Sequence, residues 1–453
     1  MTRKLFGTDG VRGKANVHPV TVDNALILGR TAVRYFQKNS PIHEGKHRIV
    51  VGKDTRLSSY MLEAAMAAGI CSAGADAILL GPLPTPGISF ITRSMRADAG
   101  VVISASHNPY FDNGIKFFSK DGTKLTDGVE QEIEAAFNQD TTDNLPTDRG
   151  AGKIYRVNDA QGRYVEFLKA SFPRDLTLDG IQISLDCANG AAYLVAPTVF
   201  TELGAAVRTY AKTPNGENIN DACGALHPEN VAGKVVNDGA DIGISLDGDG
   251  DRVILVDEKG AIVDGDLIIG AAALALKEQG RLTNDRVVTT IMTNVGLELY
   301  LKDKGIAMSR TGVGDRYVSE EMQKTGAVIG GENSGHIIFS EFNPTGDGIL
   351  TALQILAIMQ RSGRKLSELV AGIPLFPQVM KKLTVAKKIP LKDLPKTTKA
   401  IADGEKAIGR GRVVVRYSGT EPVLRVMAEG EDEAKCAAVV AAIMDTAKKE
   451  LGA

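Results

Sequence analysis

Strand-like and helix-like stretches alternate along most of this 453-residue chain, and no other feature constrains its fold as strongly. The apolar run HRIVVG precedes the helix-like SSYMLEAAMAAGICSAG, which leads to the strand-like DAILLG. The same order recurs from IQISLDCANG and again from RVVTTIM. Since strands that alternate with helices build βαβ units, the pattern predicts an α/β fold with mostly parallel sheets in three successive units.

The end of the chain has a different pattern. Residues 373–396 carry four prolines and many lysines, which is typical of a connector or an edge region. A helix-like stretch, two strand-like runs and a final helix-like stretch follow, and they predict a small α+β domain. With further breaks near residues 155 and 257, we expect four domains at 1–155, 156–257, 258–372 and 373–453.

Composition limits the function classes. The chain is 43% hydrophobic and 24% charged, with a net charge of −2, so it has no general attraction for nucleic acid or anionic membranes. We expect neither partner. The amino-terminal sequence lacks the apolar core of a signal peptide, and no run of about 18 apolar residues could span a membrane. Four widely spaced cysteines without a CxxC pair favour reduced thiols and a cytoplasmic location.

The stretch AGVVISASHNPYFDNGIKFF, residues 99–118, places a serine where a strand ends. Its apolar run has the β-branched content of a buried strand, and Asn108-Pro109 marks a turn. We therefore expect Ser106 on a tight loop at the carboxyl end of that strand, as a candidate nucleophile.

A second stretch, SLDGDGDRVILVDEKG, alternates Asp247, Asp249 and Asp251 with glycine after another strand-like run. Three carboxylates this close repel one another unless water or a bound cation compensates them. Hard oxygen ligands suit Mg²⁺, Mn²⁺ or Ca²⁺. Glu258 stands at the twelfth position of an EF-hand pattern, but Arg252 at the sixth excludes that motif. A metal site is favoured over a solvated Asp-Gly turn.

Other polar loops are less specific. RYSGTEPVLR, residues 416–425, offers arginine forks and backbone amides for a phosphate, or is a hairpin turn with surface arginines. GGENSGH, residues 330–336, suits the hydroxyls of a polyol, or is an ordinary polar turn. FGTDGVRG, residues 6–13, and VGKDTR, residues 51–56, are weaker signals. Because ligands bind beyond the carboxyl ends of strands in such sheets, these loops together predict phosphoryl transfer on a polyhydroxylated phosphate.

In this order, SASHNP, DGDGDR, GENSGH and RYSGTEP resemble the four signature loops of the α-D-phosphohexomutases, and the resemblance covers the whole chain. It implies four domains around a central cleft, the first three with similar mixed α/β cores and the fourth smaller. FGTDGVRG and PNGENINDACGALHPE, residues 214–229, look like the phosphoglucosamine mutase branch. The sister phosphomannomutase/phosphoglucomutase branch is the alternative.

The resemblance also implies roles for the four domains, in order phosphoserine, metal-binding, sugar-binding and phosphate-binding. Ser106 would be the phosphorylated serine, and its phosphate would hold one Mg²⁺ with the three aspartates. Arg12 and Lys116 would lie beside the transferring phosphoryl group. The residues implied to bind substrate are Glu332, Ser334, His336, Arg416, Ser418, Gly419, Thr420 and Arg425.

The reaction that the resemblance implies is reversible conversion of glucosamine 6-phosphate to glucosamine 1-phosphate. A hexosamine or hexose 1,6-bisphosphate would be intermediate and activator, and the product would supply UDP-N-acetylglucosamine and peptidoglycan synthesis. The family also suggests a homodimer. One departure is Gly312 in RTGVGDRY, where many relatives carry lysine, so we assign no phosphate contact there.

Two other functions are weaker. A serine hydrolase would carry G-x-S-x-G around its nucleophile, and that motif is missing around Ser106. His107, being adjacent in sequence, is expected to point away from the serine. A sugar-phosphate sensor on this fold would have lost the nucleophile or the acidic cluster, and both are intact.

Overall fold

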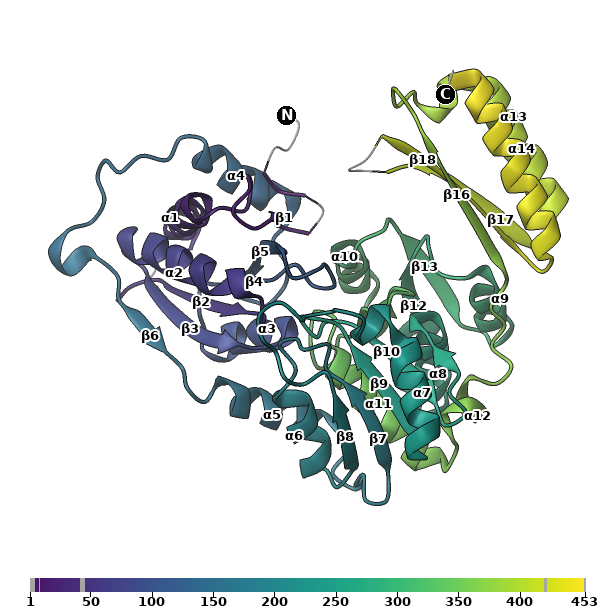
Figure 1. Ribbon diagram of the computed structural model, residues 1–453, viewed down its shortest axis with the longest axis horizontal. Coiled ribbons are helices and arrows are strands. Elements are labelled where there is room, and N and C mark those ends of the chain that lie inside the picture. The colour runs from purple at the N-terminus through teal and green to yellow at the C-terminus, as the bar shows by residue number, and fades with distance from the viewer. Residues whose placement is uncertain (1–4, 8, 41–44, 419–421, 452–453) are drawn as a thin grey trace. The chain divides into compact units, whose positions relative to one another are not determined.

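Among the described residues, four sheets form the framework of the protein (Figure 1). The structure is a computed structural model and describes residues 5–7, 9–40, 45–418 and 422–451. Two compact units divide the chain. One contains Met1–Ile291 and Ser309–Ala371, and the other contains Met292–Met308 and Gly372–Ala453.

The first sheet has the strand order β1-β5-β4-β2-β3-β6. Neighbours β4, β2, β3 and β6 run parallel, whereas β5 is antiparallel to both β4 and β1. The strands are β1 (Val11–Lys14), β2 (Arg48–Lys53), β3 (Asp76–Pro82), β4 (Ala99–Ile103), β5 (Asp112–Ser119) and β6 (Ile154–Arg156).

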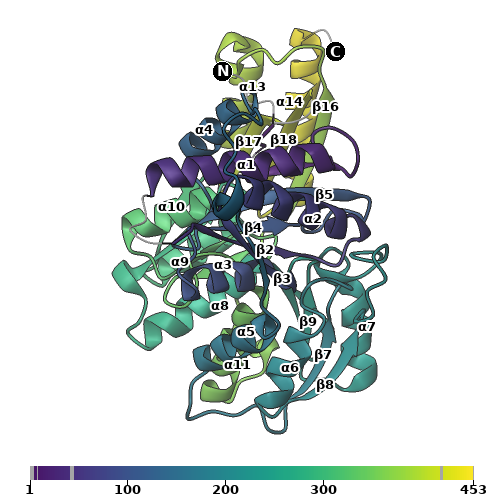
Figure 2. The ribbon, with the colours of Figure 1, turned by 90° about the vertical axis from the view of Figure 1, so that its left-hand side faces the viewer.

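Helices cover both faces of this sheet because its inner strands are apolar on both sides. Ile49 and Val51 face one core, into which α1 and α2 also pack. Gly52 faces the opposite side and leaves room there for Ile88 of α3. Figure 2 shows α1 and α2 lying side by side over the sheet. The helices are α1 (Val22–Asn39), α2 (Leu57–Ser72), α3 (Thr85–Ser94) and α4 (Asp127–Phe137).

The second and third sheets repeat this mixed plan. Their orders are β11-β10-β9-β7-β8 and β13-β12-β14-β15. The second has β7 (Gln182–Asp186), β8 (Ala206–Tyr210), β9 (Ile242–Leu246), β10 (Val253–Asp257) and β11 (Ile262–Val263), with α5 (Ala160–Ser171), α6 (Val195–Glu202) and α7 (Pro228–Asp238). The third has β12 (Arg286–Thr290), β13 (Ala307–Thr311), β14 (Ile329–Gly331) and β15 (Ile337–Phe339), with α8 (Gly265–Glu278), α10 (Asp315–Thr325), α11 (Gly348–Ser362) and α12 (Leu366–Val370).

One topological feature is common to the three mixed sheets. In each, a strand paired in parallel with an inner neighbour is followed at once by an antiparallel partner: β4 by β5, β9 by β10 and β14 by β15. The connecting loops hold Ser106, the three aspartates and GENSGH respectively. The three chemistry-bearing loops therefore occupy equivalent positions, each at the carboxyl end of a parallel strand.

The second unit is built on an antiparallel sheet of order β16-β18-β17. Apolar residues of β17 and β18 pack against Cys436, Val440 and Ile443 of α14. Its elements are α9 (Val295–Asp303), β16 (Gln378–Thr384), α13 (Pro395–Ile408), β17 (Gly411–Tyr417), β18 (Val423–Gly430) and α14 (Glu433–Leu451).

The predicted α/β class, with three similar mixed cores and a smaller α+β region, is confirmed. The sheets are less parallel than the alternation suggested, because each of the first three carries the antiparallel strand described above. Within the described residues, none of the helices has both the length and the apolar character required to cross a membrane.

Candidate active site

Ser106 lies on a tight loop directly after β4, as the sequence predicts. Its backbone is left-handed, with a φ of 53°, and the residue is 1% exposed. Its Oγ donates a hydrogen bond of 2.7 Å to Asp247 Oδ2. The predicted nucleophile and the predicted acidic cluster therefore meet, although they are 141 residues apart.

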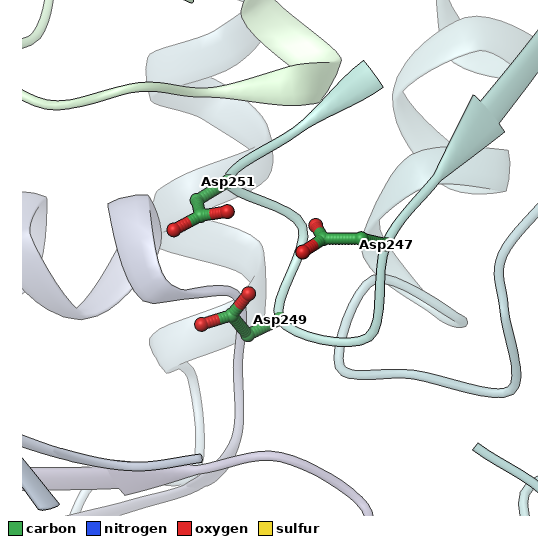
Figure 3. A group of neighbouring side chains, drawn as sticks. All are labelled: Asp247, Asp249 and Asp251. Atoms are coloured by element: carbon green, nitrogen blue, oxygen red, sulfur yellow. The ribbon is translucent and has the colours of Figure 1, made fainter. Parts of the chain in front are cut away.

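The aspartates lie on the loop between β9 and β10, and Figure 3 shows their carboxylates turned toward a common point. One oxygen from each of Asp247, Asp249 and Asp251 can be chosen so that all three lie within 4.8 Å of one another. Gly250, with a φ of 70°, makes the turn that brings them together. All three residues are at least 96% buried, since the largest exposure is the 4% of Asp251.

The pKa values of this cluster shift in opposite directions, because burial and mutual repulsion raise them whereas Lys116 and Thr85 lower that of Asp249. Burial raises the pKa of Asp247 well above its usual range, and the charges of Asp251 and Asp249 add to that rise. Burial also raises the pKa of Asp251. The pKa of Asp249 is lowered despite its burial, because Lys116 and Thr85 stabilise its charged form. Without a bound cation, the three carboxyl groups therefore differ in their protonation: burial favours the protonated form of Asp247, and Lys116 favours the charged form of Asp249.

The donor set fits a hard divalent cation. The Oδ1 atoms of Asp249 and Asp251 are buried and accept no hydrogen bond from the described residues. Buried carboxylate oxygens without a partner are costly unless a cation contacts them. The serine hydroxyl adds a further oxygen, so the cluster offers the oxygen-only environment that Mg²⁺ prefers.

Lys116 and Arg12 reach the same cluster from the first sheet. Lys116 is 2% exposed, and its Nζ lies 3.0 Å from Asp249 Oδ2 and 3.4 Å from Asp9 Oδ2. Arg12, on β1, forms an ion pair with Asp9. Because Asp9 contacts both cations, it links the two predicted catalytic side chains.

His107 departs from its prediction. Its Nδ1 lies 3.4 Å from Ser106 Oγ, whereas we expected the ring to point away. The left-handed backbone of the serine explains the difference, because the expectation assumed an ordinary extended or helical serine. Burial, with the charges of Arg252 and Arg12, lowers the pKa of His107 to about 4. The imidazole beside the serine is therefore neutral near pH 7.

The GENSGH loop lies directly against the acidic loop. Arg252 and His336 form a β-bridge, and the Val253 amide donates to the Gly335 carbonyl at 3.1 Å. His336 is 2% exposed, with Nε2 3.9 Å from Asp251 Oδ2 and 3.2 Å from Asp315 Oδ2. Glu332 is mostly buried and Ser334 half-buried on the same loop. The structure thus brings this loop together with the metal candidate.

Gly312, the third-domain departure, is exposed, and a Cβ added there would lie in ordinary contact with the ring of Tyr317. The neighbouring Arg316 does not fill this position, because its guanidinium pairs with Asp127 and lies 3.4 Å from Glu130 Oε2. Arg310 Nη1 donates to the Thr290 carbonyl at 3.2 Å.

In the second unit, the predicted phosphate-binding arginines face each other across two strands. Arg416 of β17 is the direct cross-strand partner of Arg425 of β18. Burial lowers the pKa of Arg416, and the charge of Arg425 lowers it further. Ser418 follows β17, and Lys388 Nζ donates to its carbonyl at 2.6 Å. Gly419 and Thr420, predicted for this group, lie outside the described residues.

Two residues of the site, Lys124 and Thr85, had no sequence signal strong enough to single them out. Lys124 pairs with both Asp9 and Asp315, which ties the first sheet to α10. Thr85, at the start of α3, donates from its hydroxyl to Asp249 Oδ2 at 2.8 Å. Each is a common residue type whose partner lies far away in the chain. The LPTP stretch before α3 is the only local hint, because proline at the start of a helix fixes that helix terminus.

Comparison with known families and proteins finds matches along almost the whole chain. Models of phosphoglucomutase/phosphomannomutase match as alpha/beta/alpha domain I at residues 3–144, domain II at 162–260, domain III at 264–376 and the C-terminal domain at 380–446. A phosphoglucosamine mutase of Syntrophotalea carbinolica is 54% identical over 100% of this chain and 99% of its own length. One from Geobacter sp. (strain M21) is 56% identical over 95% of this chain and 94% of its own.

Solved structures share the fold at lower identity. A phosphoglucomutase/phosphomannomutase family protein from Burkholderia thailandensis superposes with a TM-score of 0.83 at 24% identity, covering 98% of this chain and 97% of that one. A putative phosphomannomutase from Thermus thermophilus gives a TM-score of 0.77 at 22% identity, covering 99% of both chains. With four domain models matched in order and full-length relatives above half identity, the chain belongs to the phosphoglucomutase/phosphomannomutase family.

Proposed function

We propose that this chain is an intramolecular phosphotransferase that interconverts glucosamine 6-phosphate and glucosamine 1-phosphate. The observation that carries the proposal is the buried contact between Ser106 Oγ and Asp247, beside Lys116. A nucleophilic hydroxyl, an oxygen-rich metal site and a buried cation together suit phosphoryl transfer. Full-length relatives named phosphoglucosamine mutase, at 51–56% identity, support the amino-sugar substrate.

Ser106 acts as a phosphoryl carrier in this proposal. The bond between phosphorus and Ser106 Oγ breaks as the C1 hydroxyl oxygen of glucosamine 6-phosphate bonds to phosphorus, and the C1 hydroxyl proton passes to the serine oxygen, which becomes a hydroxyl again. The resulting 1,6-bisphosphate turns around, and its 6-phosphate then phosphorylates Ser106 again. Carrying the group on a serine ester keeps it from water, because phosphate monoesters hydrolyse extremely slowly without catalysis.

The positively charged residues and the carboxylates around Ser106 have different roles in this proposal. Lys116 and Arg12 stabilise the negative charge on the transferring oxygens, since both reach the acidic cluster. Asp247, Asp249 and Asp251 would hold Mg²⁺ with oxygens of phospho-Ser106. When bound there, the ion neutralises charge at the transferred phosphoryl group. His107, whose Nδ1 lies 3.4 Å from Ser106 Oγ, orients the serine loop in this proposal.

The substrate contacts follow the same proposal. Glu332, Ser334 and His336 hydrogen-bond the sugar hydroxyls. Arg416, Ser418, Gly419, Thr420 and Arg425 hold the phosphate that does not react. We also propose a cytoplasmic location and a homodimer. Light scattering on the purified chain tests the dimer.

The decisive experiment is ³¹P NMR of the purified protein with Mg²⁺ and a trace of hexose 1,6-bisphosphate. Glucosamine, glucose and mannose 6-phosphates are supplied in turn, and the 1-phosphate signal is followed with time. We expect glucosamine 6-phosphate to react fastest. Faster glucose or mannose turnover would move the chain to the sister phosphomannomutase/phosphoglucomutase activity. These sugars differ from glucosamine at C2, where a few hydrogen bonds decide preference.

A further inference from the structure

Arg56 lies fully buried beneath the serine loop, although no step of the proposed reaction uses it. It is 0% exposed. Its Nη2 donates to the carbonyls of Ser106 and Asn108, both at 2.8 Å. Its Nη1 donates to the carbonyl of Asp112 at 3.1 Å and also to that of Pro109. One guanidinium therefore gathers four carbonyls of the loop that carries the nucleophile.

Asp54 completes this support from below. It accepts from Arg56 Nε at 2.7 Å and from the Ser104 hydroxyl at 2.6 Å, both on Oδ2. The Ser104 hydroxyl oxygen in turn accepts the amide N–H of Ser106 at 2.9 Å. Both the amide and the carbonyl of Ser106 are thus fixed, directly or through Ser104, to one buried ion pair. We call Asp54, Arg56 and Ser104 the loop brace.

The second domain adds one more donor to the same carbonyls. Asn220 Nδ2 donates to the Ser106 carbonyl at 2.9 Å and to that of Asn108 at 3.2 Å. Asn220 belongs to the stretch 214–229 that marks the mutase branch in the sequence. The position of the serine loop is therefore shared between two domains.

The cost of this arrangement argues that it serves the reaction. Burying a guanidinium and a carboxylate is costly, and the pair is often no more stabilising than apolar residues. A serine with φ near +53° adds backbone strain. The arginine fork offers five fixed donors, and lysine cannot replace them geometrically. Such a pair is suited to hold one strained backbone conformation, in which Ser106 Oγ meets the acidic cluster.

We propose that Asp54, Arg56 and Ser104 are positioning residues that hold Ser106 in its left-handed conformation for phosphoryl transfer. This inference rests on the proposed role of Ser106 as phosphoryl carrier. The brace contacts neither the acidic cluster nor the sugar-binding loop through the hydrogen bonds described above. Its loss is therefore expected to slow the chemistry and to leave sugar-phosphate binding nearly unchanged.

The test measures phosphate uptake by Ser106 from hexose 1,6-bisphosphate, followed by intact-protein mass spectrometry and corrected for folded fraction. We expect Arg56→Lys to slow uptake about a hundredfold, since a misplacement near 1 Å can cost that much. Ser104→Ala removes the hydroxyl that donates to Asp54 and accepts from the Ser106 amide, and it is expected to slow uptake at least about tenfold. In turnover, kcat should fall while KM changes less than about threefold, because the brace acts on the position of Ser106 and not on the residues proposed to bind the sugar.

The matched control is Arg30→Lys, which weakens another partly buried ion pair of the first domain. Arg30 Nε lies 3.0 Å from Asp140 Oδ2, far from the serine loop in sequence. This variant should lose thermal stability and keep wild-type uptake per folded molecule. If Arg56→Lys does not fold, Ser104→Ala carries the test alone.

The outcomes separate this inference from the proposed function. Wild-type uptake rates in the folded brace variants would overturn the positioning role. Uptake by the wild type without turnover of glucosamine 6-phosphate would overturn the proposed substrate and leave the positioning role standing. A wild type that takes no phosphate on Ser106 would overturn both.

Discussion

Two like-charged groups, one in each unit, are built in opposite ways. The acidic group Asp247, Asp249 and Asp251 is almost fully buried and held by Thr85, Lys116 and Ser106. The basic pair Arg416 and Arg425 is half-buried, and the two side chains are directly opposed on neighbouring strands. Like charges placed directly opposite destabilise a sheet. The repulsion within each group therefore lowers the stability of the free protein, and a bound ion of opposite charge can compensate for that loss.

The acidic group and the basic pair differ in how precisely their side chains are held. The acidic group is on a loop between two strands of one sheet, and donors from the first sheet and from α3 fix its atoms. The register of two strands places the basic pair, and Arg425 Nη2 lies 3.5 Å from Ser418 Oγ. A site where bonds break needs atoms held to fractions of an ångström, whereas a site that holds a phosphate passively needs charge and a fork. Under the proposed function, the acidic group serves the phosphoryl group that is transferred, and the basic pair holds the phosphate that does not react.

Removing the nucleophile, which lies against the acidic group, should give the largest loss of activity. Ser106→Ala is expected to lower turnover at least about ten-thousandfold, because among the described residues no other hydroxyl donates to Asp247. The sugar-phosphate affinity, measured by isothermal titration, should change little. Turnover within about tenfold of the wild type would contradict the carrier role. Ser72→Ala, at the end of α2, is the matched control and should remain fully active.

Metal removal should give the next largest effect, and it should depend on pH. Chelation is expected to abolish turnover, and Mg²⁺ to restore it. Burial and the neighbouring carboxylates raise the pKa of Asp247, so the metal-free cluster keeps a proton that Mg²⁺ must displace. Affinity for Mg²⁺ should therefore rise with pH.

Thermal unfolding with and without Mg²⁺ measures this. The stabilisation by Mg²⁺ should be larger at about pH 8 than at about pH 5.5, because fewer protons remain to be displaced. Asp249→Asn should lose most of the stabilisation, and Asp175→Asn, at an exposed site, should keep it. A gain in melting temperature that is the same at both pH values would show that no proton is displaced.

The basic pair is tested by Arg425→Met. We expect this substitution to raise KM for the sugar phosphate about tenfold to a hundredfold, because the loss of one hydrogen bond between charged groups weakens binding by about that factor. The free protein should not lose stability from the lost charge, because the substitution relieves repulsion with Arg416. Steady-state kinetics and thermal melting give both readouts. Arg410→Met, at an exposed arginine of the same sheet region, is the control. An unchanged KM would mean that this pair does not grip the substrate.

The chemistry-bearing loops could be predicted from sequence because each follows an apolar run. Ser106 and the three aspartates stand at strand ends, and such ends converge in α/β sheets. That local rule places the residues without any knowledge of the sheet order. It could not give the antiparallel partners β5, β10 and β15, since strand direction depends on pairing between distant segments.

The residues that the sequence did not reveal act over long distances. Arg56 stood in VGKDTR, one of the weakest signals, and its role is visible only when its guanidinium meets carbonyls 50 residues away or more. Lys124 and Asp315 are 191 residues apart and form an ion pair. The orientation of His107 depends on a single left-handed φ at Ser106, which residue type does not predict. Charge pairing and backbone strain are properties of the assembled fold.

The smallest effect is expected at Asp347, a buried carboxylate outside the acidic group. It gives a reference for the three aspartates of that group. Asp347 caps α11 and accepts hydrogen bonds from the Leu350 amide at 3.0 Å and the Tyr164 hydroxyl at 2.7 Å. Burial raises its pKa to about 6, although hydrogen bonds from Leu350 and Tyr164 act against that rise. In the unfolded chain it ionises near its ordinary value of 3.8. The folded protein thus holds a proton that the unfolded chain releases, and stability falls as pH rises between these two values.

Asp347→Asn removes this titration and keeps an oxygen to accept the Leu350 amide. The variant should therefore gain stability over the wild type at about pH 8, by up to about 3 kcal/mol for two pKa units, and the gain should shrink near pH 4. Urea unfolding at both pH values measures it. The gain should be the same with and without Mg²⁺, unlike any change in the acidic group. A dependence on Mg²⁺ would mean that Asp347 is coupled to the acidic group, and that the cluster extends beyond Asp247, Asp249 and Asp251.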